Sequence, residues 1–195
     1  MPEWAARQAV GRVAVIHPHS RPRIAPWGDQ AVVAFGRGEK LFCCFFDGKK
    51  WGEPVPTGIA GEASSLCHFE GKTVYLAATD GEIYRLEGRK WTKDSPPGGV
   101  GKGRLDYPGC RKTRLSAAGK VLVAIWTDGK KLFTSSKPGG RAGGWSAPRE
   151  IFNEERGVHH LGVPVRSVEN FVPLVWSIRG KNTGARFLRV PVKQP

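Results

Sequence analysis

A repeated unit constrains the fold of this 195-residue chain more than any other feature of its sequence. Each copy contains a strand, a Gly-centred turn, a β-branched strand, a second turn, a third strand and then a Trp. Gly28, Gly71 and Gly119 mark equivalent turns, 43 and 48 residues apart. A period of about 40–50 residues with several strands per unit is typical of β-propeller blades. The repeat therefore predicts an all-β fold.

Three copies are complete and a fourth stops before its Trp. The expected strands are 22–29, 31–35 and 40–46 before Trp51, then 65–72, 73–78 and 82–87 before Trp91, then 114–120, 121–126 and 131–136 before Trp145, and finally 163–170, 171–176 and 185–192. No stretch has a sustained helical period, so we expect almost no helix.

The two ends of the chain are expected to complete one blade together. Trp4 begins a segment, 4–10, that is similar to the Trp-led strands expected after Trp51 and Trp145. Pairing 4–10 with 186–192 would remove two exposed sheet edges, which otherwise promote association. We therefore expect a single domain, 1–195: a small β-propeller of four blades, each with four antiparallel strands, closed by pairing of the N- and C-terminal strands. The alternatives are a fragment of a larger ring and a ring completed by dimerisation.

The expected blades cover most of the chain. Their approximate bounds are 22–57, 64–97 and 112–152, with a last blade made of 162–192 plus 4–10.

The cysteines do not form a disulfide pattern. Cys43 and Cys44 are adjacent in an expected strand and should point to opposite faces. Cys67 and Cys110 add no Cys-x-x-Cys spacing. No signal-peptide pattern or membrane-spanning apolar run occurs. These features predict reduced, mostly buried thiols and a cytoplasmic protein, or a secreted one if a signal has been removed.

The chain is strongly basic, with 31 Lys and Arg against 17 Asp and Glu, a formal net charge of +14. Such a surface attracts polyanions: nucleic acid, sulfated or uronic glycans, and anionic lipid headgroups. The charges recur in every expected blade and are densest between 102 and 137. The alternative is that they only keep polar loops soluble.

One turn sequence points to a family. The segment 47–54, Asp-Gly-Lys-Lys-Trp-Gly-Glu-Pro, resembles the Asp-box of the sialidase-like β-propellers, also called the bacterial neuraminidase repeat. Segments 136–148 and 87–91 are similar but more altered. The resemblance implies a propeller in which the Asp holds local backbone and the Trp packs between sheets. Trp51, Trp91 and Trp145 are therefore expected to be core anchors rather than ligand platforms.

The resemblance extends only partly to catalytic residues. Sialidases clamp a carboxylate with three arginines and use a Tyr–Glu nucleophilic pair with an Asp acid/base, as glycoside cleavage requires. Arg23 begins Arg-Ile-Ala-Pro, which resembles the family's Arg-Ile-Pro with an extra Ala. Asp106 and Tyr107 are weak catalytic candidates. No Glu is convincingly placed beside a Tyr, so enzymatic activity stays open and is the less favoured interpretation.

Alignment of the repeats places two arginines at one position. Arg23 and Arg114 each lie five residues before a repeat glycine, so their side chains should point the same way. In a four-bladed ring their blades face each other across the axis. We therefore expect an anion site there, unless each Arg pairs with a carboxylate such as Asp29 or Glu62. The candidate ligand-binding residues are Arg23, Arg111, Arg114, Arg166, Arg179 and Trp27.

Neither a metal nor a cofactor is expected. His17, His19, His159 and His160 have no carboxylate or Cys at a supporting spacing. The Gly-rich segment 98–103 lacks the P-loop spacing.

The sequence thus predicts a non-catalytic binding module that recognises an acidic ligand, most simply an acidic glycan. A sialidase-like glycoside hydrolase or lyase is one alternative. A scaffold that binds protein or nucleic acid through basic surfaces is another, for which Trp27 is the evident stacking residue. The module is expected to be a monomer or a homodimer.

Overall fold

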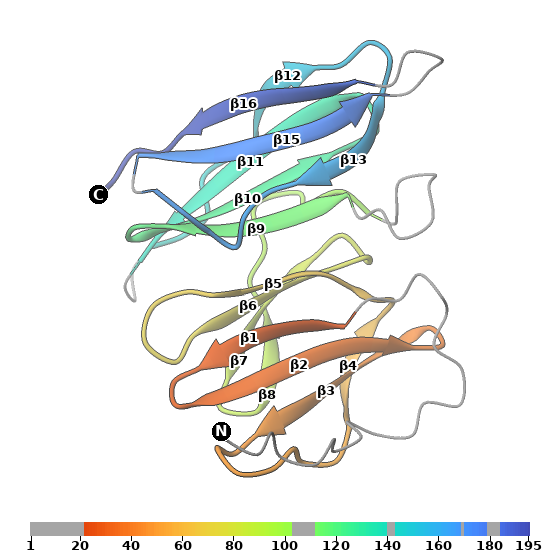
Figure 1. The fold of residues 1–195 in the computed structure, drawn as a ribbon, viewed down its shortest axis with the longest axis vertical. Helices are drawn as coiled ribbons and strands as arrows, with labels where there is room; N and C mark the ends of the chain where they lie inside the picture. Colours follow the sequence, from red (N-terminus) through yellow and green to blue (C-terminus); the bar gives the residue numbers. More distant parts are fainter. Residues whose placement is uncertain (1–21, 103–111, 140–142, 169, 179–183) are drawn as a thin grey trace, which may run out of the picture.

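The computed structural model describes residues 22–102, 112–139, 143–168, 170–178 and 184–195. These residues contain sixteen strands and no helix, and the strands form four sheets (Figure 1). The all-β prediction is confirmed. Among the described residues, no helix is present that could cross a membrane.

The first two sheets are antiparallel and follow the chain order. The first contains β1 (Arg23–Trp27), β2 (Gln30–Arg37), β3 (Lys40–Phe46) and β4 (Val55–Ala60). The second contains β5 (Ala63–His68), β6 (Val74–Ala78), β7 (Ile83–Glu87) and β8 (Lys90–Lys93).

In the last two sheets the chain passes from the fourth sheet to the third and back, because β14 lies between β13 and β15 in sequence but pairs in the third sheet. The third has the order β12-β11-β10-β9-β14, and its strands are β9 (Thr113–Ala118), β10 (Val121–Thr127), β11 (Lys131–Pro138), β12 (Arg149–Asn153) and β14 (Arg166–Ser167). The fourth has the order β13-β15-β16, and its strands are β13 (Val158–Gly162), β15 (Phe171–Ile178) and β16 (Ala185–Pro191).

The repeat glycines explain why the inner hairpins could be located from sequence. Gly28, Gly71 and Gly119 have φ angles of 67°, 52° and 57°. This left-handed region is open to glycine at little cost, whereas other side chains are strained there. The registers also repeat: Arg23 pairs with Ala34 in the first hairpin, and Arg114 pairs with Ile125 in the third.

The inner strand of the last copy differs from expectation. Instead of one strand over 163–170, β13 pairs with β15, and β14 crosses to pair in parallel with β9. Pro164 separates the two strands and has no N–H to donate to a ladder. The carbonyl of Val165 instead accepts a 2.8 Å hydrogen bond from the N–H of Ala117.

Each pair of successive sheets encloses an apolar core. Leu41 and Leu76 belong to the core between the first and second sheets, and Leu122 lies in the next core. Trp176 is 2% exposed in the core between the third and fourth sheets. The sheets therefore stack in sequence, with β1, β5 and β9 in succession near the middle (Figure 1).

Two of the cysteine expectations are confirmed among the described residues. Cys43 faces the core shared with the second sheet, whereas Cys44 packs with Val33 and Phe35 on the other side of the first sheet. Cys43, Cys44 and Cys67 are free and buried. Cys110 lies outside the described residues.

Closure of the ring stays a prediction. Among the described strands, none of the first sheet pairs with one of the fourth, and β16 pairs only with β15. Segment 4–10, which we expected to close the ring, lies outside the described residues.

The Asp47 turn has its own hydrogen bonds. Oδ1 of Asp47 accepts from the N–H groups of Lys49 and Lys50 at 2.9 and 2.8 Å. The N–H of Lys50, and then that of Lys49, lowers the pKa of this carboxyl. Asp128 caps a turn in the same way, but between β10 and β11. Because this Asp turn occurs at two different places in a blade, its hydrogen bonds do not identify a family.

Candidate ligand-binding site

A polar cluster holds the loop after β11 against the second sheet. Nζ of Lys137 lies 2.9 and 3.0 Å from the two carboxylate oxygens of Asp94, which follows β8. The indole N–H of Trp145 donates to the carbonyl and to Oδ1 of Asp94 at 2.8 and 3.0 Å. Burial and then the charge of Asp94 raise the pKa of nearby Tyr75. Trp145 is thus an anchor between sheets, as expected.

The other two blade-ending tryptophans also pack inward to different degrees. Trp91 is 8% exposed in the core between the first two sheets. Trp51 is half-buried, and its ring lies 5.2 Å from that of Phe46.

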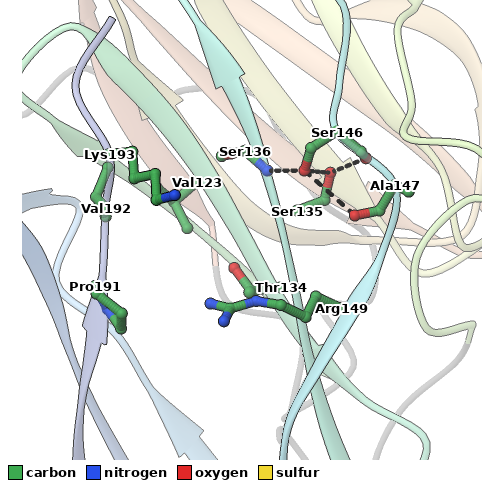
Figure 2. A pocket seen from close by; sticks show the side chains of 10 residues that line it. All are labelled: Val123, Thr134, Ser135, Ser136, Ser146, Ala147, Arg149, Pro191, Val192 and Lys193. Carbon is green, nitrogen blue, oxygen red and sulfur yellow. Dashed lines mark hydrogen bonds between the residues drawn. The ribbon is translucent and has the colours of Figure 1, made fainter.

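The loop that Trp145 anchors forms one wall of a pocket between the third and fourth sheets. The pocket has a volume of about 520 Å³. Its lining comes from β10, β11, β12, the loop before β12 and the residues at the end of β16 (Figure 2). The lining residues are Val123, Thr134, Ser135, Ser136, Ser146, Ala147, Arg149, Pro191, Val192 and Lys193.

Hydrogen bonds fix the wall of the pocket that Ser135, Ser136 and Ser146 form, here called the serine wall. Oγ of Ser135 donates to the carbonyl of Ser146 at 2.7 Å. The N–H of Ser136 donates to Oγ of Ser146 at 3.0 Å (Figure 2). Ser135 is buried while Ser146 is exposed. The wall therefore presents a positioned hydroxyl to solvent without needing a ligand to order it.

Two cations extend into the pocket from opposite sides. Arg149 begins β12 opposite Thr134, and Lys193 follows β16 (Figure 2). Neither side chain forms a hydrogen bond or an ion pair with a described residue. They are the only ionisable groups among the ten lining residues. The pocket therefore has a positive potential that favours an anionic group.

The remaining walls are apolar. Val123 and Val192 are 2% and 8% exposed, Pro191 lies next to Val192, and Ala147 lies across the pocket next to Ser146 (Figure 2). Such a surface suits the C–H face of a small ring, while the serine and cationic walls suit its polar substituents.

The described arginines that the sequence predicted to bind a ligand lie outside this pocket. Arg114 donates from Nη1 to the carbonyl of Ser64 at 3.2 Å, so it links β9 to β5. Nη2 of Arg166 lies 3.0 Å from Nδ1 of His68, between β14 and β5. Arg23 begins β1 and is half-buried. None of these three lines the pocket. Arg111, Arg179, Asp106 and Tyr107 lie outside the described residues.

Trp27 is half-buried rather than an open platform. Its ring lies 5.3 Å from that of Phe45, and it packs against the core between the first two sheets.

Sequence reasoning missed Ser146, Arg149 and Lys193. The repeat alignment compared inner strands, whereas these residues lie on an outer strand, its preceding loop and the segment after β16. The sequence feature that could have indicated this site is local: Ser135, Ser136, Ser146 and Arg149 lie close in sequence to Trp145, the third blade-ending Trp.

The fold is similar to that of solved lectins. No protein-family model matches the chain, and no curated protein is similar to it in sequence. A fucose-specific lectin from Aleuria aurantia, in an Hg-derivative form, has a TM-score of 0.52 at 12% identity, covering 88% of this chain and 58% of the lectin. A mutant of that lectin in complex with Fucα1-6GlcNAc has a TM-score of 0.51 at 14% identity, covering 91% and 64%.

The chain thus spans about three fifths of the length of these lectins. At such identities the likeness concerns the fold alone, which is all-β and propeller-like. The sialidase-like resemblance gains no support from these comparisons.

Proposed function

We propose that this chain is a non-catalytic carbohydrate-binding module that holds an acidic sugar in the pocket between the third and fourth sheets. The observation that carries the proposal is the pair Arg149 and Lys193, two exposed cations that enter one pocket and form no hydrogen bond or ion pair with a described residue.

The two cations suit a carboxylate or sulfate on a sugar. A guanidinium can hold a carboxylate through two parallel hydrogen bonds, and an ammonium adds a compact charge without a fixed direction. Because the site is open to water, its attraction for an anion should weaken as salt is added. Ser146 offers a hydroxyl to the sugar's own hydroxyl groups.

The similarity in fold supports a sugar as the ligand. The two solved structures are of a fucose-specific lectin, one of them with a bound fucosylated disaccharide. Fucose is neutral, so an acidic ligand rests on the pocket of this chain and not on the comparison.

The lining favours binding over glycoside cleavage. Cleavage requires a nucleophile or base and a proton donor on opposite sides of the bond, usually two carboxyl groups. None of the ten lining residues has a carboxyl, imidazole, phenol or thiol group. The same lining favours a glycan over nucleic acid, because it contains no aromatic ring for base stacking.

Calorimetric titration with matched sugars tests the proposal. Galacturonic acid and sialyllactose are compared with galactose, lactose and Fucα1-6GlcNAc. We expect the acidic sugars to bind, binding to be lost in Arg149→Ala, and binding to be retained in Arg37→Ala, an exposed arginine at the end of β2. Binding of only the neutral sugars would contradict the acidic ligand, and binding of none would contradict the module itself.

A further inference from the structure

We propose that an acidic oligosaccharide chain, rather than a single terminal acidic sugar, binds along the outer edges of the third and fourth sheets. The inference rests on the proposed function, because the pocket described above would hold one end of the chain. We call this path the basic seam and define its two ends by Lys193 and Arg149 and by Lys130 and Arg156.

The seam follows two edge strands that run alongside each other. Among the described strands, β12 and β16 are the outermost of their sheets (Figure 1). Arg149, at the start of β12, shares the pocket with residues that end and follow β16. Glu154, just after β12, lies 3.7 Å from Nε of Arg186 at the start of β16. The two strands are therefore antiparallel across the seam.

A second hollow lies at the far end of β12. It has a volume of about 620 Å³. The β10–β11 turn, the end of β12 and the turn before β13 contribute its lining: Asp128, Gly129, Lys130, Lys131, Asn153, Arg156 and Gly157. The side chains of Lys130 and Arg156 are exposed and form no hydrogen bond or ion pair with a described residue.

Most carboxylates on the seam already form an ion pair or hydrogen bonds within the chain. Oε2 of Glu150 lies 2.8 Å from Nζ of Lys131. Glu154 is buried and accepts from the indole N–H of Trp176 at 3.0 Å. Asp128 accepts from backbone N–H groups in its own turn.

Glu155 is exposed beside Arg156 and offsets one positive charge. Asp128 keeps its negative charge, because its hydrogen-bond partners are neutral N–H groups, so three cations (Lys130, Lys131, Arg156) and three carboxylates (Asp128, Glu150, Glu155) balance at the far end. That end therefore offers an acidic group the exposed side chains of Lys130 and Arg156, which form no ion pair with a described residue, whereas Lys193 and Arg149 give the near end its excess of positive charge.

The distance between the two ends selects a ligand with several sugar units. Arg149 in the first hollow and Asn153 in the second lie four residues apart on β12, or roughly 13 Å at about 3.3 Å per residue. One monosaccharide cannot contact both ends. In a chain with repeated acidic groups, binding at one end raises the local concentration of the next acidic group at the other, so affinity should increase with chain length.

A length series tests the seam. The full chain is titrated calorimetrically with galacturonic acid and its di-, tetra- and hexasaccharides. We expect the hexasaccharide to bind at least tenfold more tightly per molecule than the disaccharide. The double variant Lys130→Ala/Arg156→Ala should lose that gain and still bind the disaccharide normally. The matched control is Lys49→Ala/Arg37→Ala, which removes two exposed cations from the first sheet and its turn.

The outcomes separate the two proposals. If the disaccharide binds through Arg149 and longer chains bind no better, the seam is wrong and the proposed function stands. If no uronic saccharide of any length binds, both are wrong. If single-stranded DNA of equal charge binds as tightly and responds equally to both sets of variants, the surface is a general polyanion surface, and the glycan seam is wrong.

Discussion

The ammonium of Lys137 and the carboxylate of Asp94 form an ion pair at 2.9 Å across the boundary between the second and third sheets, with only 8% of Lys137 exposed. Trp145 donates to the same carboxylate. The ion pair and the Trp145 hydrogen bond therefore hold the loop that lines the pocket to the second sheet, although the pocket itself lies between the third and fourth sheets.

Replacing one partner of that pair should therefore destabilise the protein. Lys137→Met removes the partner at 2.9 Å and leaves the Asp94 carboxylate with Arg85, whose Nε lies 3.9 Å away. Loss of one member of a buried pair costs about 3–5 kcal/mol, and the remaining Arg85 should reduce that cost. Urea unfolding followed by Trp fluorescence measures the change. Lys131→Met, which removes an exposed pair with Glu150, is the control and should have little effect. Equal stability of the two variants would show that the Asp94 cluster does not tie the sheets together.

The pH dependence of stability should reveal a buried thiol. Burial raises the pKa of Cys67 to about 12, against 9.0 for an ordinary thiol. Its contribution is complete below pH 9 and is lost as pH rises from 9 towards 12, because the unfolded chain loses its proton first. From pH 8 to pH 10 the free energy of unfolding should fall by about 1.4 kcal/mol from this group. Cys67→Ala should fall less over that range, and an identical fall would exclude the thiol as a cause.

Trp91 should contribute more to stability than Trp51. Trp91 is buried between the first two sheets, and removing a buried Trp side chain costs about 3–5 kcal/mol. Trp51 is only half-buried, so Trp51→Ala should cost less. Thermal unfolding of both variants gives the order. Acrylamide quenching is the independent check: the protected fraction should shrink in Trp91→Ala while Trp126 and Trp176, 7% and 2% exposed, keep the remainder, and an unchanged protected fraction would contradict the packing.

Ring closure can be tested by truncation. If segment 4–10 completes the last blade, deletion of residues 1–10 leaves the edge of β16 unpaired and removes Trp4. The melting temperature should then fall clearly. The replacement Trp4→Ala alone should produce part of the same fall. An unchanged melting temperature in the deletion variant would show that the strand does not contribute to the fold.

The expected anion site near the axis has a separate test. Arg23 and Arg114 occupy the same position in their hairpins, and an anion bound between them would stabilise the native state. A thermal-shift panel of sulfate, phosphate, sialic acid and uronic acids should show stabilisation that the variant Arg23→Ala/Arg114→Ala lacks. Stabilisation that persists in this variant, but disappears in Arg149→Ala, would assign the effect to the pocket between the third and fourth sheets.

The parts that could be predicted from sequence are those with local causes. The glycines at 28, 71 and 119 have positive φ, and this local requirement located the inner hairpins of the first three copies. Strand 40–46 has the predicted bounds because it lies between two turns. The alternation of Cys43 and Cys44 between two cores follows from the period of a strand.

The parts that could not be predicted depend on tertiary contacts. The crossing of β14 to β9 joins residues about fifty positions apart, and only Pro164 marked a break in the chain. The pocket joins Ser146 and Arg149 to Lys193, over a similar separation. No local pattern indicates that an outer strand and the segment after β16 will meet.

The positions of the repeat glycines and of the pocket have an evolutionary consequence. The glycines belong to the inner hairpins, whereas Arg149, Lys193, Lys130 and Arg156 are exposed on outer strands and turns. Exposed positions that are neither turn glycines nor parts of a buried network tolerate substitution with little change in stability. Substitutions at these exposed positions can therefore change the preferred ligand one residue at a time, while selection for folding acts on the inner hairpins. Proteins that share this fold can thus come to differ in ligand specificity through a few surface substitutions.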